Sequence, residues 1–246
     1  MKRVAFISGG TSGLGLQVVK DLVDKNYKVY SLSKSKDKIN KIENEFYGAE
    51  FYCGNVADES NIRKIYQVIY DNCGHLDVIV NNAGIILPGG VEKLSADDWN
   101  TMFNVNVNSI FLTTKILLPL LKKSEAASII NVSSISSKMT GSSIAYSAGK
   151  AAVDMMTKSL AKELAAYGIR VNSVNPGIMN TGFQVHNNLI AENNYNDFLK
   201  DIESTYPLGV GTAKDVSNLI MFLISKEAKW ITGSNYIIDG GKSINI

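Results

Sequence analysis

Short apolar runs alternate along the chain with longer segments of helical periodicity. The apolar runs are rich in β-branched residues, which is typical of buried strands, and they cover residues 4–8, 29–32, 50–52, 77–80, 128–132, 170–174 and 235–238. Helical spacing occupies residues 14–25, 59–72, 97–121, 146–167 and 213–224. This alternation predicts one α/β domain over residues 1–246, a doubly wound parallel sheet covered by helices on both faces. Ligands of such sheets bind at the carboxyl ends of the strands.

Composition restricts the class of protein further. The chain has 246 residues, 45% of them hydrophobic and 20% charged, and a formal net charge of +2 with no concentrated basic block. We therefore expect neither nucleic acid nor a membrane as a partner. Cys53 and Cys73 are too few and too far apart for a disulfide framework or a zinc site, and His75 and His186 share no motif. A cytoplasmic protein without a metal site is the simpler interpretation.

A glycine-rich turn lies between the first expected strand and the first expected helix. Its pattern is Gly9-x-x-x-Gly13-x-Gly15. Glycines in this position permit positive φ and a close approach of the backbone to a pyrophosphate. The helix that follows offers N–H groups and a partial positive charge to phosphates. The turn therefore predicts a dinucleotide site, with an ordinary tight turn as the alternative.

Tyr146 and Lys150 stand four positions apart in a segment of helical periodicity. A helix advances about 100° and 1.5 Å per residue, so both side chains emerge on one face, about 6 Å apart along the axis. A free tyrosine has a pKa of about 10, and a nearby positive charge lowers that pKa. Such a pair also occurs by chance on helix surfaces, so its meaning depends on the surrounding motifs.

Seven motifs follow one another in an order that resembles the short-chain dehydrogenase/reductase family over essentially the full chain. They are Ser8-Gly9-x-x-x-Gly13-Leu14-Gly15, Asn81-Asn82-Ala83-Gly84, Asn106 in the run 105–111, Val132-Ser133-Ser134, Tyr146-x-x-x-Lys150, Pro176-Gly177-x-x-x-Thr181 and Asp239-Gly240-Gly241. The resemblance implies a Rossmann-like fold and an NAD(P)-dependent oxidoreductase that acts on CH–OH or C=O groups. Within the family, the length and the ending resemble 3-oxoacyl-carrier-protein reductases.

The same resemblance implies four catalytic residues. Tyr146 would be the general acid in reduction and the base in oxidation, and Lys150 would lower its pKa and hold the nicotinamide ribose. Ser134 would hydrogen-bond the substrate oxygen and the tyrosine, while Asn106 would anchor a water that links Lys150 to solvent. Hydride transfer to a carbonyl leaves an alkoxide, which a positioned acid must protonate. The nicotinamide carries the hydride itself.

Two of these assignments have competing neighbours. Asn104 and Asn108 alternate with Asn106, which we favour because family members place the amide just ahead of a V-x-x-x-F run. Ser133 has the usual family spacing of thirteen residues before the tyrosine, whereas alignment of the strand end gives Ser134. We favour Ser134 because strand register is stiffer than the loop that follows it.

The expected cofactor site combines the glycine turn, the ends of several strands and the tyrosine–lysine pair. Its residues are Gly9, Thr11, Ser12, Gly13, Leu14, Gly15, Ser33, Lys34, Asn55, Val56, Asn82, Ala83, Gly84, Tyr146, Lys150, Pro176, Gly177, Met179 and Thr181. NAD enzymes usually carry a carboxylate at the end of the second strand, but here Ser33 and Lys34 precede the first acid, Asp37. Because Lys34 suits a 2′-phosphate, we expect NADP(H) rather than NAD(H). A solvated lysine-rich loop is the alternative.

Residues 180–207 hold the position of the family's substrate lid. Their Asn-rich composition, with interspersed aromatic residues, suits a mobile segment that orders over substrate, and a plain helical excursion is the alternative. In the family, the helices ending near residue 121 and beginning at residue 146 form subunit interfaces. We therefore expect a homodimer or a homotetramer.

The leading prediction is an NADP(H)-dependent ketoreductase or alcohol dehydrogenase for a small carbonyl or alcohol substrate. Glu125 and Tyr167 stand about where 3-oxoacyl-carrier-protein reductases tend to have basic residues. A 3-oxoacyl thioester and a small hydroxylated compound are therefore both open as substrates. The alternative from another class is a non-catalytic NAD(P)-binding sensor or structural protein. Such proteins typically lose the tyrosine or the lysine, and this chain keeps both.

Overall fold

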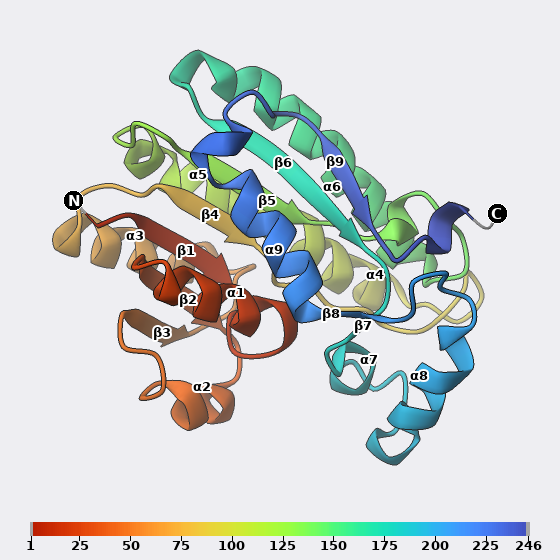
Figure 1. Cartoon of the computed structure of the whole chain (residues 1–246). Coiled ribbons are helices and arrows are strands. Elements are labelled where there is room, and N and C mark those ends of the chain that lie inside the picture. Colours follow the sequence, from red (N-terminus) through yellow and green to blue (C-terminus); the bar gives the residue numbers. More distant parts are fainter. Residues whose placement is uncertain (1, 245–246) are drawn as a thin grey trace.

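A seven-stranded parallel sheet forms the centre of the computed structural model, which describes residues 2–244 (Figure 1). The strands are β1 (Val4–Ser8), β2 (Lys28–Ser33), β3 (Ala49–Cys53), β4 (Val78–Asn81), β5 (Ser128–Val132), β6 (Arg170–Pro176) and β9 (Asn235–Ile238). Their order in the sheet is β3-β2-β1-β4-β5-β6-β9. The order reverses between β1 and β4, so the predicted doubly wound α/β fold is confirmed.

Helices cover both faces of the sheet. They are α1 (Gly13–Asp24), α2 (Lys36–Ile42), α3 (Glu59–Asn72), α4 (Ala96–Phe103), α5 (Ser109–Leu121), α6 (Ile144–Leu164), α7 (Phe183–His186), α8 (Tyr195–Glu203) and α9 (Ala213–Leu223). Apolar side chains of α1 and α9 form one core with the first face, and those of α3, α5 and α6 form the core on the other. Burial of these two apolar layers supplies the main favourable free energy of folding. None of the helices between residues 2 and 244 has the length and apolarity needed to cross a membrane.

The long helix expected over residues 97–121 is interrupted. A π-helical turn, Asn104–Asn108, separates α4 from α5. The turn buries only the middle one of the three alternating asparagines: Asn106 is 1% exposed, whereas Asn104 and Asn108 lie on the surface. Wide turns of this kind are rare and often occur at functional sites.

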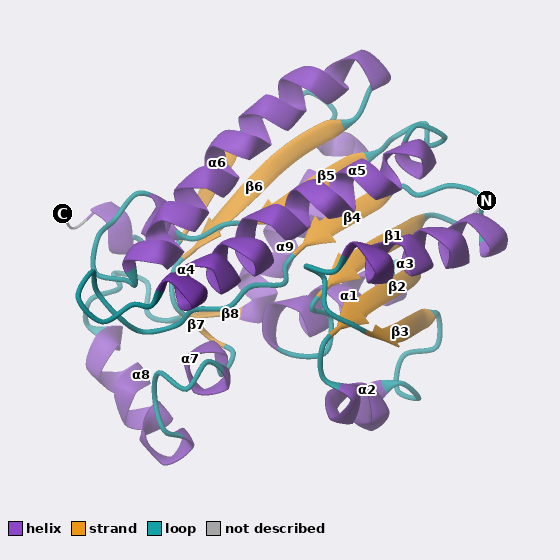
Figure 2. Ribbon diagram, turned by 180° about the vertical axis from the view of Figure 1, so that it is seen from behind, coloured by secondary structure: helices purple, strands orange, loops and turns teal. Residues whose placement is uncertain are grey.

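Two further helices extend beyond the carboxyl edge of the sheet. Both views show α7 and α8 projecting from that edge, with α2 on the other side of the same edge (Figures 1 and 2). They belong to the predicted lid segment, whose start pairs with a later strand through β7 (Met179–Asn180) and β8 (Gly211–Thr212). The loops after β1, β2, β3, β4, β5 and β6 reach this edge as well, because all six strands run in parallel.

The glycine turn after β1 is packed too closely for side chains. Gly9 has φ +76° and Gly13 has φ +53°, a region that favours glycine. A Cβ atom added at Gly15 would lie 2.1 Å from the Gly9 carbonyl oxygen and 2.5 Å from Asn82 Nδ2. That amide donates hydrogen bonds to the carbonyl oxygens of Ser8 and Gly9 at 3.0 and 3.1 Å. Gly15 therefore sets how closely α1 approaches the ends of β1 and β4.

We predict that Gly15→Ala lowers the free energy of unfolding by at least about 1–3 kcal/mol, because the added methyl group overpacks the turn. Gly90→Ala is the matched control, since a Cβ there meets no atom within 4 Å, and its expected effect is within about 0.5 kcal/mol. Urea unfolding of the three proteins measures both values. Equal stability of Gly15→Ala and the wild type would contradict the close packing described.

Candidate active site

A cavity of about 960 Å³ opens at the carboxyl edge of the sheet. Every residue of the expected cofactor site lines it, from the glycine turn to Thr181. Ser134, Tyr146 and Lys150 line the same cavity, whereas Asn106 lies behind its wall. The fold thus brings residues from six strand ends and two helices to one place.

The end of the cavity at the glycine turn has the properties of a phosphate site. Ser12 is the N-cap of α1, yet its side chain makes no capping hydrogen bond, and the first turn of α1 carries no acidic residue. The N–H groups of that turn therefore remain available to an anion. Thr181 packs against the glycine turn, since a Cβ at Gly13 would lie 3.2 Å from Thr181 Cβ. A dinucleotide pyrophosphate fits this arrangement.

At the other end, Tyr146 is buried beside Ser134. Burial raises the pKa of the Tyr146 phenol to about 12, and hydrogen bonding to Ser134 acts in the opposite direction. The net shift is upward, so the lowered tyrosine pKa expected from the sequence is not a property of the chain alone. Desolvation of the phenolate outweighs the stabilisation available from its neighbours.

Lys150 is held by the end of β5. The residue is 3% exposed, and its ammonium donates a hydrogen bond of 2.8 Å to the Val132 carbonyl oxygen. Nζ lies 5.5 Å from the centre of the Tyr146 ring. Burial lowers the pKa of Lys150 to about 8, and the carboxylate of Asp154 opposes this shift. At neutral pH the ammonium form still predominates.

The two adjacent serines face different partners. The Ser133 hydroxyl donates to the backbone oxygen of Lys150 at 3.1 Å and is buried. The Ser134 hydroxyl accepts a hydrogen bond from the Ser136 N–H at 3.1 Å and is also hydrogen-bonded to the Tyr146 phenol. Both serines line the cavity, but the Ser133 hydroxyl is engaged with the backbone of α6, whereas the Ser134 hydroxyl is the one that reaches the Tyr146 phenol.

Asn106 clamps the segment that follows β4. Its Oδ1 accepts from the Ile85 N–H at 2.9 Å, and its Nδ2 donates to the Ile85 carbonyl oxygen at 2.8 Å. A Cβ at Gly84 would lie 3.1 Å from Asn106 Oδ1 and 3.6 Å from Lys150 Nζ. The missing side chain at Gly84 therefore leaves the space between the amide and the ammonium open, on the cavity side.

At the end of β2 the structure separates the two residues expected to meet a 2′-phosphate. The Ser33 hydroxyl is buried without a hydrogen-bond partner among the described residues. Lys34 is exposed and lines the cavity. A contact with a phosphate would therefore come from Lys34 and from further cations around it, with Ser33 contributing to the wall.

Comparisons with known proteins agree with this geometry. The family model described as short chain dehydrogenase matches residues 3–190. The chain belongs to the short-chain dehydrogenase family. It is accordingly an NAD(P)-dependent oxidoreductase that acts on CH–OH or C=O groups.

Individual members of the short-chain dehydrogenase family are similar to this chain over nearly its whole length. The 2,5-dichloro-2,5-cyclohexadiene-1,4-diol dehydrogenase LinX of Sphingobium indicum is 38% identical over 99% of this chain and 97% of its own. The 3-oxoacyl-[acyl-carrier-protein] reductase FabG of Buchnera aphidicola is 32% identical over 98% and 97%. The structure of ElxO with NADP bound superimposes with a TM-score of 0.87 at 32% identity, covering 99% of this chain and 100% of ElxO. A tyrosine-to-phenylalanine variant of ElxO with NADPH bound matches equally well.

Several residues of this short-chain dehydrogenase cavity were not predicted. They come from α2, the segment after β4, the loop before α6 and the chain end, and include Lys38, Ile86, Met139 and Lys242. The expected lid gave a signal for Asn187, since aromatic and amide residues cluster there. No sequence pattern marks Lys242, which reaches the cavity only because the chain end returns to the sheet edge after β9.

The side chain of Asn187 joins the predicted lid segment to the loop after β4. Asn187 Oδ1 accepts from the Ile86 N–H at 3.0 Å, and Nδ2 donates to the Phe183 carbonyl oxygen at 2.8 Å. Ile86 directly follows the residue that Asn106 clamps. At the base of the lid, the Tyr195 hydroxyl accepts from the N–H groups of Thr181 and Gly182 at 3.2 and 3.0 Å.

We predict that Asn187→Ala speeds amide hydrogen exchange in Phe183–His186 and at Ile86 by about fivefold, since a hydrogen bond contributes about 1 kcal/mol. Asn196→Ala is the matched control, because Asn196 is an exposed lid residue whose side chain has no hydrogen bond among the described residues. Mass-spectrometric exchange of both variants measures the effect. Unchanged exchange in Asn187→Ala, or the same increase in the control, would show that this amide does not hold the lid.

Proposed function

We propose that the protein is an NADP(H)-dependent reductase or dehydrogenase that transfers a hydride between nicotinamide and a ketone or secondary alcohol. The observation that carries this proposal is the shared cavity: Ser134, Tyr146 and Lys150 lie at one end and the phosphate-binding glycine turn at the other. A dinucleotide bound between them supplies the hydride and, in its oxidised form, a positive charge near the phenol.

Tyr146 is the proton donor in reduction and the proton acceptor in oxidation. A phenol whose pKa is raised to about 12 keeps its proton at neutral pH and can donate it to an alkoxide. Ser134 orients the substrate oxygen toward that phenol, because it hydrogen-bonds the phenol and lines the same cavity. The reverse reaction requires a lower tyrosine pKa, which positive charge beside the phenolate provides.

Lys150 and Asn106 support the tyrosine from behind. The Lys150 ammonium lies beside the phenol ring and supplies fixed positive charge. The Asn106 amide hydrogen-bonds both the N–H and the carbonyl oxygen of Ile85 and so fixes the wall next to Lys150. The open space at Gly84 between these two groups suits a water that passes protons from Lys150 to solvent.

The cofactor is NADP(H) rather than NAD(H). Lys34 is the exposed, cavity-lining residue after β2, and the nearest acidic side chain, Asp37, is exposed and does not line the cavity. A carboxylate that would hydrogen-bond an unphosphorylated ribose is thus missing from the described wall of the cavity. The similar ElxO structure contains NADP.

The substrate is a small ketone or secondary alcohol. The reaction end of the cavity is bounded by apolar side chains that include Ile86, Met139 and Phe183, which favour a compact, partly apolar molecule. The similarity to FabG keeps a 3-oxoacyl thioester as a second candidate. Glu125 and Tyr167 are exposed where such enzymes tend to have basic residues, but Lys122 and Lys123 are exposed beside them. This surface therefore has mixed charge and does not select an acidic carrier protein.

The protein acts as a homodimer or homotetramer in a reducing compartment such as the cytoplasm. Phe111 on α5 and Met155 on α6 are 51% and 61% exposed, and exposed apolar side chains on neighbouring helices suit a subunit interface. Cys53 and Cys73 are free thiols, which agrees with reducing surroundings.

Tyr146→Phe tests the proposed chemistry directly. We expect turnover of ketones with NADPH to fall by about a hundredfold or more, because the proton donor is lost, while NADPH affinity measured by fluorescence titration stays within about twofold. Tyr70→Phe, which removes an exposed phenol away from the cavity, keeps full activity.

A panel of cyclic ketones, small hydroxyketones and a 3-oxoacyl thioester provides the substrates for this comparison. Persistent turnover in Tyr146→Phe would refute the proton-transfer role. Absence of turnover with every ketone and alcohol, together with tight NADPH binding, would favour a non-catalytic sensor.

A further inference from the structure

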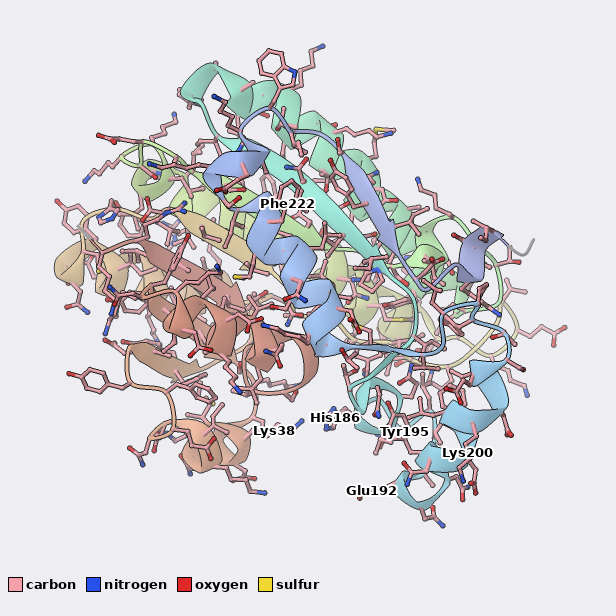
Figure 3. All side chains as sticks on the ribbon, viewed as in Figure 1. Lys38, His186, Glu192, Tyr195, Lys200 and Phe222 are labelled. Carbon is pink, nitrogen blue, oxygen red and sulfur yellow. The ribbon has the colours of Figure 1, made fainter. Side chains whose placement is uncertain are left out.

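Two basic residues at the mouth of the cavity have no part in the mechanism above. Lys38 lies in the first turn of α2 and His186 is the last residue of α7, and both side chains line the cavity. Figure 3 shows them pointing toward one another from these two elements. They lie close enough for the charge of Lys38 to act on the imidazole.

Among the described residues, Lys38 and His186 have no acidic partner that pairs with them. Neither side chain forms a hydrogen bond or salt bridge within residues 2–244. Burial and the charge of Lys38 lower the pKa of His186, and Glu192 opposes them. Burial and the charge of Lys41 lower the pKa of Lys38. Two basic groups that face one another across a cavity are stabilised by an anion between them.

The surroundings indicate which anion. Lys34 is four residues before Lys38 and lines the same wall, at the end of the second strand, where doubly wound folds place the adenosine ribose. Thr181 lies against Gly13 of the phosphate-binding turn, and His186 follows five residues later. The pair thus stands at the adenosine side of the cavity, beyond the pyrophosphate.

The same short helix reaches the reaction end. The Phe183 ring at the start of α7 lies 6.5 Å, centre to centre, from the Tyr146 ring. Since α7 is a single turn that ends at His186, a ligand that holds His186 also fixes Phe183 against the catalytic tyrosine.

We propose that Lys38 and His186 together bind the 2′-phosphate of the cofactor, one from the body of the protein and one from the lid. The phosphate then fastens the lid across the cavity and orders Phe183 beside Tyr146. This inference rests on the proposed NADP(H) dependence, and it assigns part of the cofactor preference to the lid.

Fragments of the cofactor test this inference without catalysis. Calorimetry measures binding of adenosine 2′,5′-bisphosphate and of ADP to the wild type, Lys38→Ala, His186→Ala and the double variant. Lys36→Ala is the matched control, because Lys36 is an exposed lysine of α2 that does not line the cavity. We expect each single change to weaken the bisphosphate about tenfold, as loss of one charge-assisted hydrogen bond does, and to leave ADP binding and the control unchanged.

Amide exchange of Phe183–His186 provides the second readout. Adenosine 2′,5′-bisphosphate should slow this exchange in the wild type and fail to do so in His186→Ala, while ADP has no such effect in either protein. Equal weakening of ADP and the bisphosphate would place the pair at the pyrophosphate and overturn the proposal. Undiminished bisphosphate binding in both single variants would overturn it as well.

The outcome is separable from that of the proposed function. A wild type that binds NADH as tightly as NADPH would refute the NADP(H) preference itself. A wild type that prefers the bisphosphate, with variants that keep this preference, refutes only the role of Lys38 and His186.

Discussion

The site depends on keeping the Lys150 ammonium charged inside the protein beside Tyr146. Burial of a charge is unfavourable unless hydrogen bonds and opposite charge compensate it. Here the Val132 carbonyl oxygen accepts at 2.8 Å, and the buried Asp154 carboxylate favours the charged form. Because both groups belong to elements that pack on one another, the position of the ammonium is set by how β5 meets α6.

A buried polar chain fixes that contact. Asn81 donates to Asn131 at 2.8 Å, and Asn131 donates to Thr157 of α6 at 2.9 Å. Three elements, β4, β5 and α6, are thereby joined by side chains that are buried away from water. A satisfied buried network favours one arrangement over its competitors. Tyr146, Lys150 and Ser134 are consequently positioned by packed, hydrogen-bonded elements. The predicted lid is the more exposed part of the cavity wall.

The sequence was sufficient for the architecture, because apolar strands and amphipathic helices carry strong periodic signals. It also predicted that the expected cofactor residues would lie together at one edge, and they line one cavity there, since parallel strands end together. It could not show that a π-helical turn buries Asn106 alone among three alternating asparagines, because the extra residue of such a turn leaves no pattern. The upward shift of the Tyr146 pKa in the chain without cofactor could not be foreseen: spacing reveals the nearby lysine, but the dominant cause, burial of the phenol, arises only from packing. The approach of His186 to Lys38 joins residues far apart in sequence and was equally invisible.

The titration of Tyr146 tests most directly whether Lys150 and the bound oxidised cofactor together create the catalytic phenolate. Protein labelled with carbon-13 at tyrosine Cζ reports the ionisation of each phenol, and Tyr146→Phe identifies the signal of interest. In the presence of NADP⁺, we expect the pKa of Tyr146 to fall well below the value of about 12 to which burial raises it without cofactor, and to fall less in Lys150→Met. The same pKa with and without NADP⁺, or the same pKa in the wild type and Lys150→Met, would contradict the role assigned to the buried ammonium.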